Sequence, residues 1–278
     1  MAAHIREFTH ATPTSRFVVM TKAVVDCLLA ANTDNRHVRG AQVDFLVRQL
    51  TEASWTVTNQ GIGVDVNGVL IDGQHRLLAL RKAGYPPVTM LVVTGLPPEA
   101  RTAVDIGAKR TMRDLFQFAF EHHETTAKMI AVTRFWGAVS NNQRGGAPAA
   151  PTPHQLFAWY EELATPLKDV LDVQGSSRVA VPVLAAIVFR LHLFPQDARP
   201  LMFLEKVITG ADLEAASPVL TLRNWLNSPS NGGGGRSLAD ERYDKTASAL
   251  VAYLENRPLA RLYARQNITN ELRRDLRQ

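Results

Sequence analysis

The chain has 278 residues, of which 46% are hydrophobic, and it carries a formal net charge of +5. That length suffices for one large domain or two ordinary ones, and the composition is typical of a packed globular protein rather than a disordered one. The single cysteine, Cys27, excludes a disulfide framework and a cysteine-based metal site within one chain.

The sequence contains no long uninterrupted apolar run of the kind that crosses a membrane. Its polar N-terminal segment lacks the apolar core of a signal peptide, so we expect a cytoplasmic protein with no membrane partner. The positive charge comes mainly from arginine, which pairs with phosphate through a rigid fork of donors. The charge therefore favours a nucleotide or nucleic-acid partner, although solubility alone is the other reading of such an excess.

The first predicted elements are a strand and two helices. Residues 17–20 are typical of a short strand, and Thr21 can cap a helix over residues 22–31. The polar run Asn32-Thr33-Asp34-Asn35 ends that helix. A second helix is predicted over residues 42–53 from apolar residues at helical spacing.

The next segment predicts a β-hairpin. Two β-rich runs, residues 64–66 and 69–71, flank Asn67-Gly68. Asn-Gly between such runs is the strongest short hairpin signal, because both turn positions are then expected to adopt positive φ. The dipeptide Asp72-Gly73 ends the second strand.

A crossover helix and a third strand follow the hairpin. The helix is predicted over residues 74–83, and Gly84 supplies its C-terminal stop. Residues 88–93 are almost wholly apolar, which predicts a strand buried on both faces. The order strand, strand, helix, strand makes the helix a crossover between two strands of one sheet.

Beyond this sheet the sequence predicts helices only. Pro97-Pro98 begins a short helix, and the residues from Thr111 to Asp114 resemble a capping box. Several later helices begin with prolines that suit first-turn positions. All the later helices predicted in this part of the chain cover residues 129–139, 153–163, 182–193, 200–209, 218–226 and 237–254. We therefore predict an α+β protein with a tail at 1–14, a small mixed-sheet domain at 15–115 and an all-α domain at 116–278.

The turn Asp72-Gly73-Gln74-His75-Arg76, between a strand and a helix, is the strongest candidate site. A helix N-terminus offers N–H groups without intrahelical partners and the positive end of the macrodipole, and it binds phosphate readily. Gly73 lacks the Cβ that would block the approach of an anion. His75 and Arg76 place two potential cations in the first turn, which is unfavourable unless an anion compensates.

Other roles of these residues stay open. Asp72 can cap the helix, hold Mg²⁺, orient His75 or bond a sugar hydroxyl, and Gln74 adds a neutral donor and acceptor. The alternative to a site is an ordinary Asp-Gly turn with a solvated His-Arg pair. We expect His75 and Arg76 to lie at the helix entry, outside the core, while the core-facing residues are Leu77, Leu78 and Leu80.

Taken together, Asn35-Arg36, the segment GIGVDVNGVLIDGQHRLLALRKAG and the strand at 88–93 resemble the ParB/sulfiredoxin superfamily over roughly residues 15–115. The resemblance is closest to ParB-like proteins with a D-G-Q-H-R signature, many of them from phages and bacteria. The equivalent turn reads G-E-R-R in ParB, where it binds CTP phosphates, and G-C-H-R in sulfiredoxin, where it binds ATP phosphates. The resemblance implies that Gly73, His75 and Arg76 contact phosphate and that Arg36 is a further ligand, although a solvated helix entry accounts for Arg36 equally well. The candidate cofactors are a nucleoside triphosphate and Mg²⁺.

One departure from these families limits what the resemblance implies. Gln74 stands where sulfiredoxin has its redox cysteine, which excludes sulfinic-acid repair. It also stands where ParB has a glutamate linked to nucleotide hydrolysis, so hydrolysis is not implied. The C-terminal part contains no convincing helix-turn-helix, and sequence-specific DNA binding is not implied either.

A second group of candidates follows the last strand of the sheet. Asp105, Lys109 and Arg110 belong to a D-x-G-x-x-R segment that is similar to one in many D-G-Q-H-R proteins. There Asp105 can act as a metal ligand or a base, and Arg110 can close over a phosphate. An ion pair at a helix N-terminus is the alternative.

A third group lies near the C-terminus. Arg257, Arg261 and Arg265 recur every four residues, which predicts that they share one helix face. Such a face can bind a nucleic-acid backbone. A solvated helix, or a contact with acidic helices of the same chain, accounts for it equally well.

The hypothesis from sequence is a nucleotide- or phosphate-binding protein that acts in a DNA or nucleotide transaction. Asp72, His75 and Asp105 are the catalytic candidates, and Asp72 is the candidate Mg²⁺ ligand. The reactions compatible with these groups are phosphoanhydride hydrolysis, phosphotransfer and phosphodiester cleavage, which need the same charge-neutralising parts. The rival hypothesis is a non-catalytic DNA-binding, partition-like or regulatory module, and self-association into a homo-oligomer is open to both.

Overall fold

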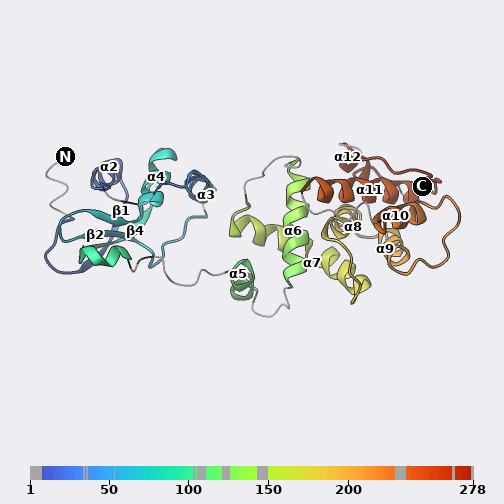
Figure 1. Ribbon diagram of the computed structural model, residues 1–278, viewed down its shortest axis with the longest axis horizontal. Helices are drawn as coiled ribbons and strands as arrows, with labels where there is room; N and C mark the ends of the chain where they lie inside the picture. Colours follow the sequence, from blue (N-terminus) through green and yellow to red (C-terminus); the bar gives the residue numbers. More distant parts are fainter. Residues whose placement is uncertain are drawn as a thin grey trace. The chain divides into compact units, whose positions relative to one another are not determined.

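The computed structural model describes residues 8–33, 35, 37–52, 54–102, 104, 111–120, 126–142, 150–228, 236–264 and 267–276. The chain divides into two compact units, Met1–Lys109 and Arg110–Gln278. The first unit holds a four-stranded mixed sheet with helices, and the described part of the second unit is entirely helical (Figure 1). This arrangement confirms the predicted α+β class.

The sheet of the first unit has the strand order β1-β4-β2-β3. Its strands are β1 (Thr14–Val19), β2 (Ile62–Asp65), β3 (Leu70–Asp72) and β4 (Thr89–Leu96). Strand β4 is central and pairs antiparallel with β1 and parallel with β2, and β2 and β3 form the predicted hairpin. The crossover helix between β3 and β4 is therefore confirmed.

Helices α2 (Lys22–Ala30), α3 (Gly40–Thr51) and α4 (Gln74–Lys82) lie on one side of this sheet (Figure 1). Their apolar residues form one core with Ile62 of β2 and Val92 of β4, both fully buried. The prediction that the last strand is buried on both faces was wrong. Met90 and Val92 are buried, whereas the alternate residues of β4 are partly exposed because these helices cover one face only.

The hairpin turn is at the predicted dipeptide, but its conformation differs from the expected one. Gly68 has a φ of 80°, whereas Asn67 has no positive φ. The carboxylate of Asp65, only 2% exposed, accepts hydrogen bonds from Asn67 N–H at 2.9 Å and from Val69 N–H at 2.8 Å. An aspartate that bonds the backbone two residues on makes a turn of its own, so one positive φ suffices here.

Replacing Asp65 by alanine should therefore lower the free energy of unfolding by about 2–3 kcal/mol, because two backbone donors lose a charged acceptor. Asp65→Asn keeps one carbonyl oxygen and should cost less. Urea unfolding measures both losses, and an Asp65→Ala protein as stable as wild type would show that the carboxylate does not hold the turn.

The second unit is built around a buried helix. Its helices are α5 (Met112–Ala119), α6 (Ala127–Ser140), α7 (Pro153–Gln174), α8 (Val181–Leu193), α9 (Arg199–Thr209), α10 (Pro218–Leu226), α11 (Arg236–Leu254) and α12 (Ile268–Leu272). Helix α8 is buried over most of its length and contacts α6, α7, α9 and α11. None of the helices in the described ranges is long and apolar enough to cross a membrane.

Helix starts in this unit follow the local signals of the sequence. Thr111 and Asp114 form the predicted capping box, and Pro153, Pro182 and Pro218 occupy first-turn positions. Helix α7 runs past its predicted end at residue 163 and contains Pro166 in its interior. Burial of the apolar residues on both sides of this proline, Leu163 and Leu167 at 0% exposure, stabilises the longer helix.

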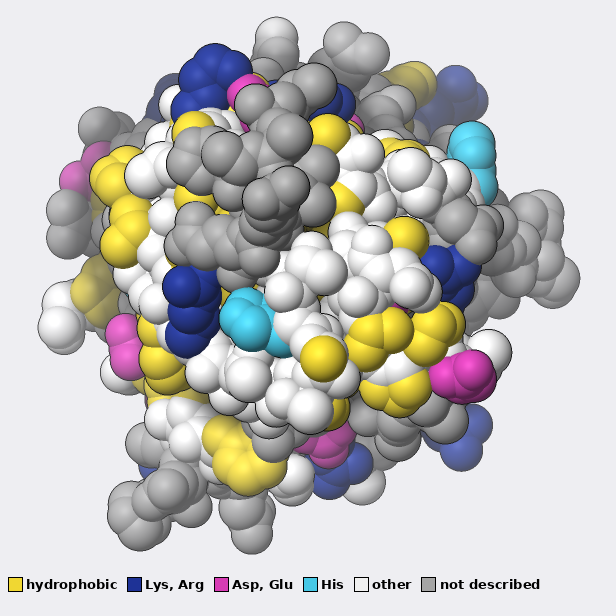
Figure 2. Space-filling view, turned by 90° about the vertical axis from the view of Figure 1, so that its left-hand side faces the viewer, with side chains coloured by type: hydrophobic (Ala, Val, Ile, Leu, Met, Phe, Trp, Pro, Cys, Tyr) yellow, Lys and Arg dark blue, Asp and Glu magenta, His cyan; other side chains and the backbone are white. Residues whose placement is uncertain are grey.

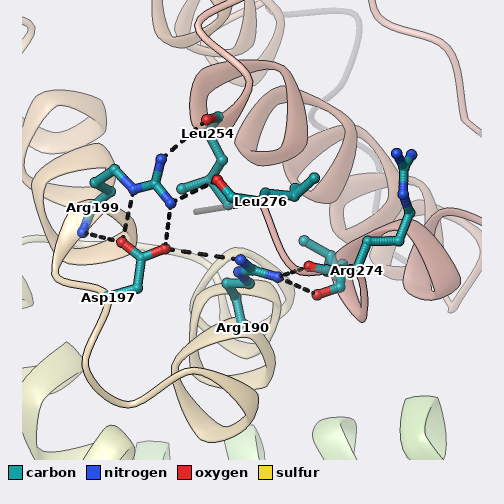
Figure 3. Close-up of polar contacts among 7 residues, drawn as sticks. Arg190, Asp197, Arg199, Leu254, Arg274 and Leu276 are labelled. Atoms are coloured by element: carbon teal, nitrogen blue, oxygen red, sulfur yellow. Dashed lines mark hydrogen bonds and ion pairs between the residues drawn. The ribbon is translucent and has the colours of Figure 1, made fainter. Parts of the chain in front are cut away.

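An arginine and aspartate network holds the C-terminal segment of this unit (Figure 3). The fully buried Arg190 donates from Nη1 to the carbonyl oxygens of Leu272, at 2.8 Å, and Arg274, at 2.5 Å. Arg199 donates to both carboxylate oxygens of Asp197 at 2.8 Å and also to the carbonyl oxygen of Leu276. These hydrogen bonds join the last described residues to α8 and α9.

The charges of this network perturb one another. The hydrogen bonds from Arg199 lower the pKa of the Asp197 carboxyl, and they more than offset the opposite effect of burial. The same carboxylate raises the pKa of Arg199. Asp197 is therefore ionised throughout the neutral range, and its charge is matched by Arg199 and by Arg190, whose Nη2 lies 3.8 Å from Asp197 Oδ2.

Candidate functional site

The candidate site turn connects β3 to α4 through Gly73. Gly73 is the N-cap of α4, with a φ of 97°, and no side chain caps the helix there. A Cβ built on Gly73 would lie 2.4 Å from Cδ1 of Ile62, which is 0% exposed. Glycine is thus required by the backbone conformation and by the packing of Ile62, in addition to the predicted need for an open approach to the helix end.

Asp72 binds its own turn rather than the first-turn amides of the helix. Its Oδ1 accepts a hydrogen bond from Gly73 N–H at 2.6 Å, and its Oδ2 lies 3.5 Å from Nη1 of Arg76. The Asp72 side chain is 28% exposed. The structure shows a pairing with Arg76, which is not one of the roles predicted for Asp72.

Arg76 joins the helix to the start of β2. Its Nη1 donates to the carbonyl oxygen of Gly61 at 2.5 Å and also faces Asp72. Nε and Nη2 make no hydrogen bond or ion pair with any described residue. The side chain is 17% exposed. Arg76 is therefore fixed through one nitrogen, while the opposite edge of its guanidinium is not used by the fold.

His75 is part of the packing between two helices. It is 8% exposed, and its Nε2 accepts a hydrogen bond at 3.0 Å from the N–H of Arg39, the N-cap of α3. A ring nitrogen that accepts a hydrogen bond carries no proton, so the ring is neutral in this arrangement. The role predicted for His75 as a cationic phosphate ligand would require this hydrogen bond to open.

Both side chains of the His-Arg pair lie at the helix entry, as predicted, but His75 is buried there and Arg76 is only 17% exposed, so neither is a solvated group. His75 faces the N-cap of α3, and Arg76 faces Gly61 just before β2. Both partners lie against the N-terminal end of α4. Of the expected core residues, Leu77 and Leu80 are fully buried and Leu78 is partly buried.

The described residues Ala31 and Asn35 lie along the outer edge of β3. Ala31 O accepts a hydrogen bond from Leu70 N–H at 2.9 Å, and Asn35 Nδ2 donates to Leu70 O at 2.6 Å. Asn35 also donates to Asn32, and Asn32 Nδ2 lies 3.5 Å from Oε1 of Gln74, which is 5% exposed. The neutral amide predicted for Gln74 is thus part of a polar network.

Sequence reasoning missed part of this surrounding structure. It treated Asn32 as a helix breaker and gave no role to the N–H of Arg39 or the carbonyl of Gly61. The contacts made by the N–H of Arg39 and the carbonyl of Gly61 could not be predicted from residue types, because every residue type except proline offers the same backbone groups. The paired asparagines at 32 and 35, before a predicted helix, were the available signal.

Four of the predicted site residues, Arg36, Asp105, Arg110 and Arg265, lie outside the described residues. Two described residues near these positions contact the site: Asn35 donates to the backbone of β3, and the N–H of Arg39 donates to His75. Within the described ranges, no cluster of three or more His, Cys, Asp or Glu side chains offers a metal site.

The predicted helix face near the C-terminus was wrong. Helix α11 ends at Leu254, Asn256 has a φ of 50°, and Arg257 precedes Pro258, so neither Arg257 nor Arg261 is helical. Proline disfavours helical backbone at the residue before it and cannot donate a helical hydrogen bond. Arg257 pairs with Glu255 at 3.0 Å, and both predicted arginines line a small cavity of about 90 Å³.

On the face that Figure 2 shows, the described basic side chains lie in separate places.

Comparison of the chain with protein-family models, with curated proteins and with solved structures found no match in any of the three.

Proposed function

We propose that the N-terminal unit binds a phosphate-bearing ligand, a nucleotide, at the turn from Asp72 to Arg76, and that the protein acts through this ligand in a DNA or nucleotide transaction. The observation that carries the proposal is the state of Arg76. One nitrogen is fixed by Gly61 and Asp72, and the edge formed by Nε and Nη2 has no partner among the described residues. A guanidinium held in this way is preorganised for two parallel hydrogen bonds to phosphate.

The setting of Arg76 supports the same ligand. Helix α4 begins at a glycine without a side-chain cap, and its macrodipole adds positive potential at that end. Asp72 and Arg76 are the charged side chains of the turn that remain partly exposed, so a ligand reaches the turn from their side. The D-G-Q-H-R resemblance supports a nucleotide rather than another anion.

We propose binding without turnover as the primary role. The Nε2 of His75 already accepts a backbone N–H, and both carboxylate oxygens of Asp72 face groups of the turn. Neither residue is therefore placed as a free general base beside Arg76. Hydrolysis, phosphotransfer or phosphodiester cleavage would require one of these contacts to be exchanged for the substrate.

Replacing Arg76 by alanine should weaken nucleotide binding by about 1.5–3 kcal/mol, the range of a charge-assisted hydrogen bond. Arg76→Lys should recover only part of that loss, because a point charge does not reproduce the planar fork. Calorimetric titration of nucleoside triphosphates measures both.

The matched control is Arg81→Ala, which removes an exposed arginine from the last turn of the same helix and should leave affinity unchanged. Thermal melting verifies that each variant is folded, since Arg76 also holds Gly61. Equal affinity of folded wild type and Arg76→Ala would remove the phosphate site. Lost binding together with a collapsed melting temperature would make Arg76 a structural residue instead.

A turnover assay with nucleoside triphosphates and Mg²⁺, with and without DNA, separates binding from catalysis. We expect no product above the level given by Asp72→Asn. Without Mg²⁺ this variant should bind nucleotide about two- to fivefold more tightly, because a carboxylate near the phosphate is removed. The opposite result would be nucleotide turnover in wild type that Asp72→Asn abolishes, or a Mg²⁺-dependent nucleotide affinity that Asp72→Asn abolishes. Either would make Asp72 the metal ligand of an enzyme.

A further inference from the structure

The second unit contains a cavity of about 580 Å³ with an unusual charge distribution. Four cationic side chains line it, Lys128 on α6, Arg178 before α8, Arg223 on α10 and Arg242 on α11. The described residues that line the cavity include no aspartate or glutamate. The volume is within the range of pockets that bind small organic ligands.

Three of these cations have no acidic partner among the described residues. Lys128 donates to the carbonyl oxygen of Val179 at 3.4 Å, and Arg223 donates to those of Val207 and Ile208. Arg178 is exposed and makes no such contact. The carbonyl groups orient Lys128 and Arg223 but do not neutralise them, so among the described residues these like charges line one cavity without a matching acid.

The fold fixes one of these cations closely. Arg223 lies against Gly210, which has a φ of 72°, and a Cβ built there would lie 2.6 Å from Nη2 of Arg223. The glycine thus makes room for the guanidinium at the end of α9. A positive group held in place beside other positive groups is favourable when an anion bridges them.

Apolar residues line the cavity beside the cations. Val179, Ile208 and Leu226 are partly exposed there, whereas Val183 and Val207 are buried behind the lining. Such a cavity suits a ligand with one anionic end and one uncharged body. Arginine binds phosphate through a matching fork of donors, and several cations together suit a group with more than one negative charge.

We propose that this cavity binds a small phosphorylated organic molecule of nucleotide size, with its phosphate groups among the cations Lys128, Arg178 and Arg223. Its uncharged body would lie on the partly exposed apolar residues Val179, Ile208 and Leu226. This site is separate from the turn of the N-terminal unit and does not depend on the function proposed for it.

The test uses the full chain with Arg76→Ala, so that nucleotide binding at the turn is removed. The two probes are ADP and inorganic pyrophosphate, which share a diphosphate group. Calorimetry should show ADP binding at least about tenfold more tightly than pyrophosphate, because only ADP has an uncharged body that can contact the apolar residues of the lining. Hydrogen exchange of residues 177–183 and 223–227 should slow when ADP binds. Replacing Lys128 and Arg178 by glutamine should weaken ADP binding by about tenfold or more for each cation removed.

The control is Lys168→Gln, which removes an exposed cation of α7 that does not line the cavity and should leave ADP affinity unchanged. Should the double variant melt early, Arg178→Gln alone answers the question, since the exposed Arg178 makes no hydrogen bond or ion pair with another described residue. The proposal is overturned if the Arg76→Ala protein binds no ADP, or if it binds ADP and pyrophosphate equally well. It is also overturned if the Lys128 and Arg178 variants bind ADP as tightly as the Lys168→Gln control. A single-stranded oligonucleotide that binds the same residues more tightly than ADP would overturn it as well. An Arg76→Ala protein that binds ADP as wild type does would support the cavity and contradict the turn.

Discussion

Replacing Gly73 by alanine should lower the free energy of unfolding by about 3 kcal/mol. Two costs add in this variant. A residue with a Cβ is strained at a φ of 97°, and the new methyl group would lie 2.4 Å from Cδ1 of Ile62, whose side chain is fully buried. Chemical unfolding in urea measures the loss.

Two further variants separate these costs. Ile62→Val removes the atom that the new methyl group meets, so the double variant Gly73→Ala with Ile62→Val should lose less than the sum of the single losses. Gly40→Ala is the matched control, since a Cβ at Gly40 meets nothing within 4 Å and alanine favours the helix. A Gly73→Ala protein as stable as the Gly40→Ala protein would contradict the described turn.

Replacing Arg190 by methionine should cost about 3–5 kcal/mol, the loss expected when one partner of a buried charge network is removed. The carbonyl oxygens of Leu272 and Arg274 would lose their donor, and Asp197 would keep only Arg199. Urea unfolding should show the loss, and limited proteolysis should cut the C-terminal segment earlier than in wild type.

Arg274→Ala is the matched control for this network. Only the backbone carbonyl of Arg274 takes part, and its side chain extends away from Arg190 (Figure 3). The variant should therefore keep wild-type stability and proteolytic resistance. If it were as sensitive as Arg190→Met, the charge of the segment rather than the buried hydrogen bonds would hold it in place.

The same network predicts how stability depends on pH. Because Arg199 lowers the pKa of Asp197 in the folded state, the stabilisation from ionised Asp197 is fully present above its unfolded pKa of about 3.9. It is lost as the pH falls through the lower pKa of the folded state. Asp197→Asn should be less stable than wild type at neutral pH and lose less on acidification, and parallel acid profiles of the two proteins would contradict this linkage.

The elements of the sheet were predictable from the sequence because local signals agree there. The Asn-Gly dipeptide, the glycine after α4 and the alternation of β-rich runs each point to the same structure, and tertiary contacts do not override them. The type of turn was not predictable, because it depends on the buried carboxylate of Asp65 two residues before Asn67.

The candidate site was predictable in position but not in detail. The D-G-Q-H-R run marks the junction of β3 and α4 correctly. The neutral state of His75 depends on the N–H of Arg39, and the orientation of Arg76 depends on the carbonyl of Gly61. Both partners are backbone groups from distant parts of the chain, which residue types and spacing do not reveal. The arginine repeat failed for a local reason, since Pro258 was visible within it.

The strand order of the sheet constrains the sequence of events as the protein folds. Strand β4 is central, yet it is the last strand to be synthesised, and its residue Thr94 pairs with Thr14. The hairpin of β2 and β3 and the helix after it depend on near neighbours, so they can form early. We expect β1 to dock only once β4 has left the ribosome. Because the pairing of β1 with β4 joins residues far apart in the sequence, this unit should fold more slowly than a helical bundle of similar size.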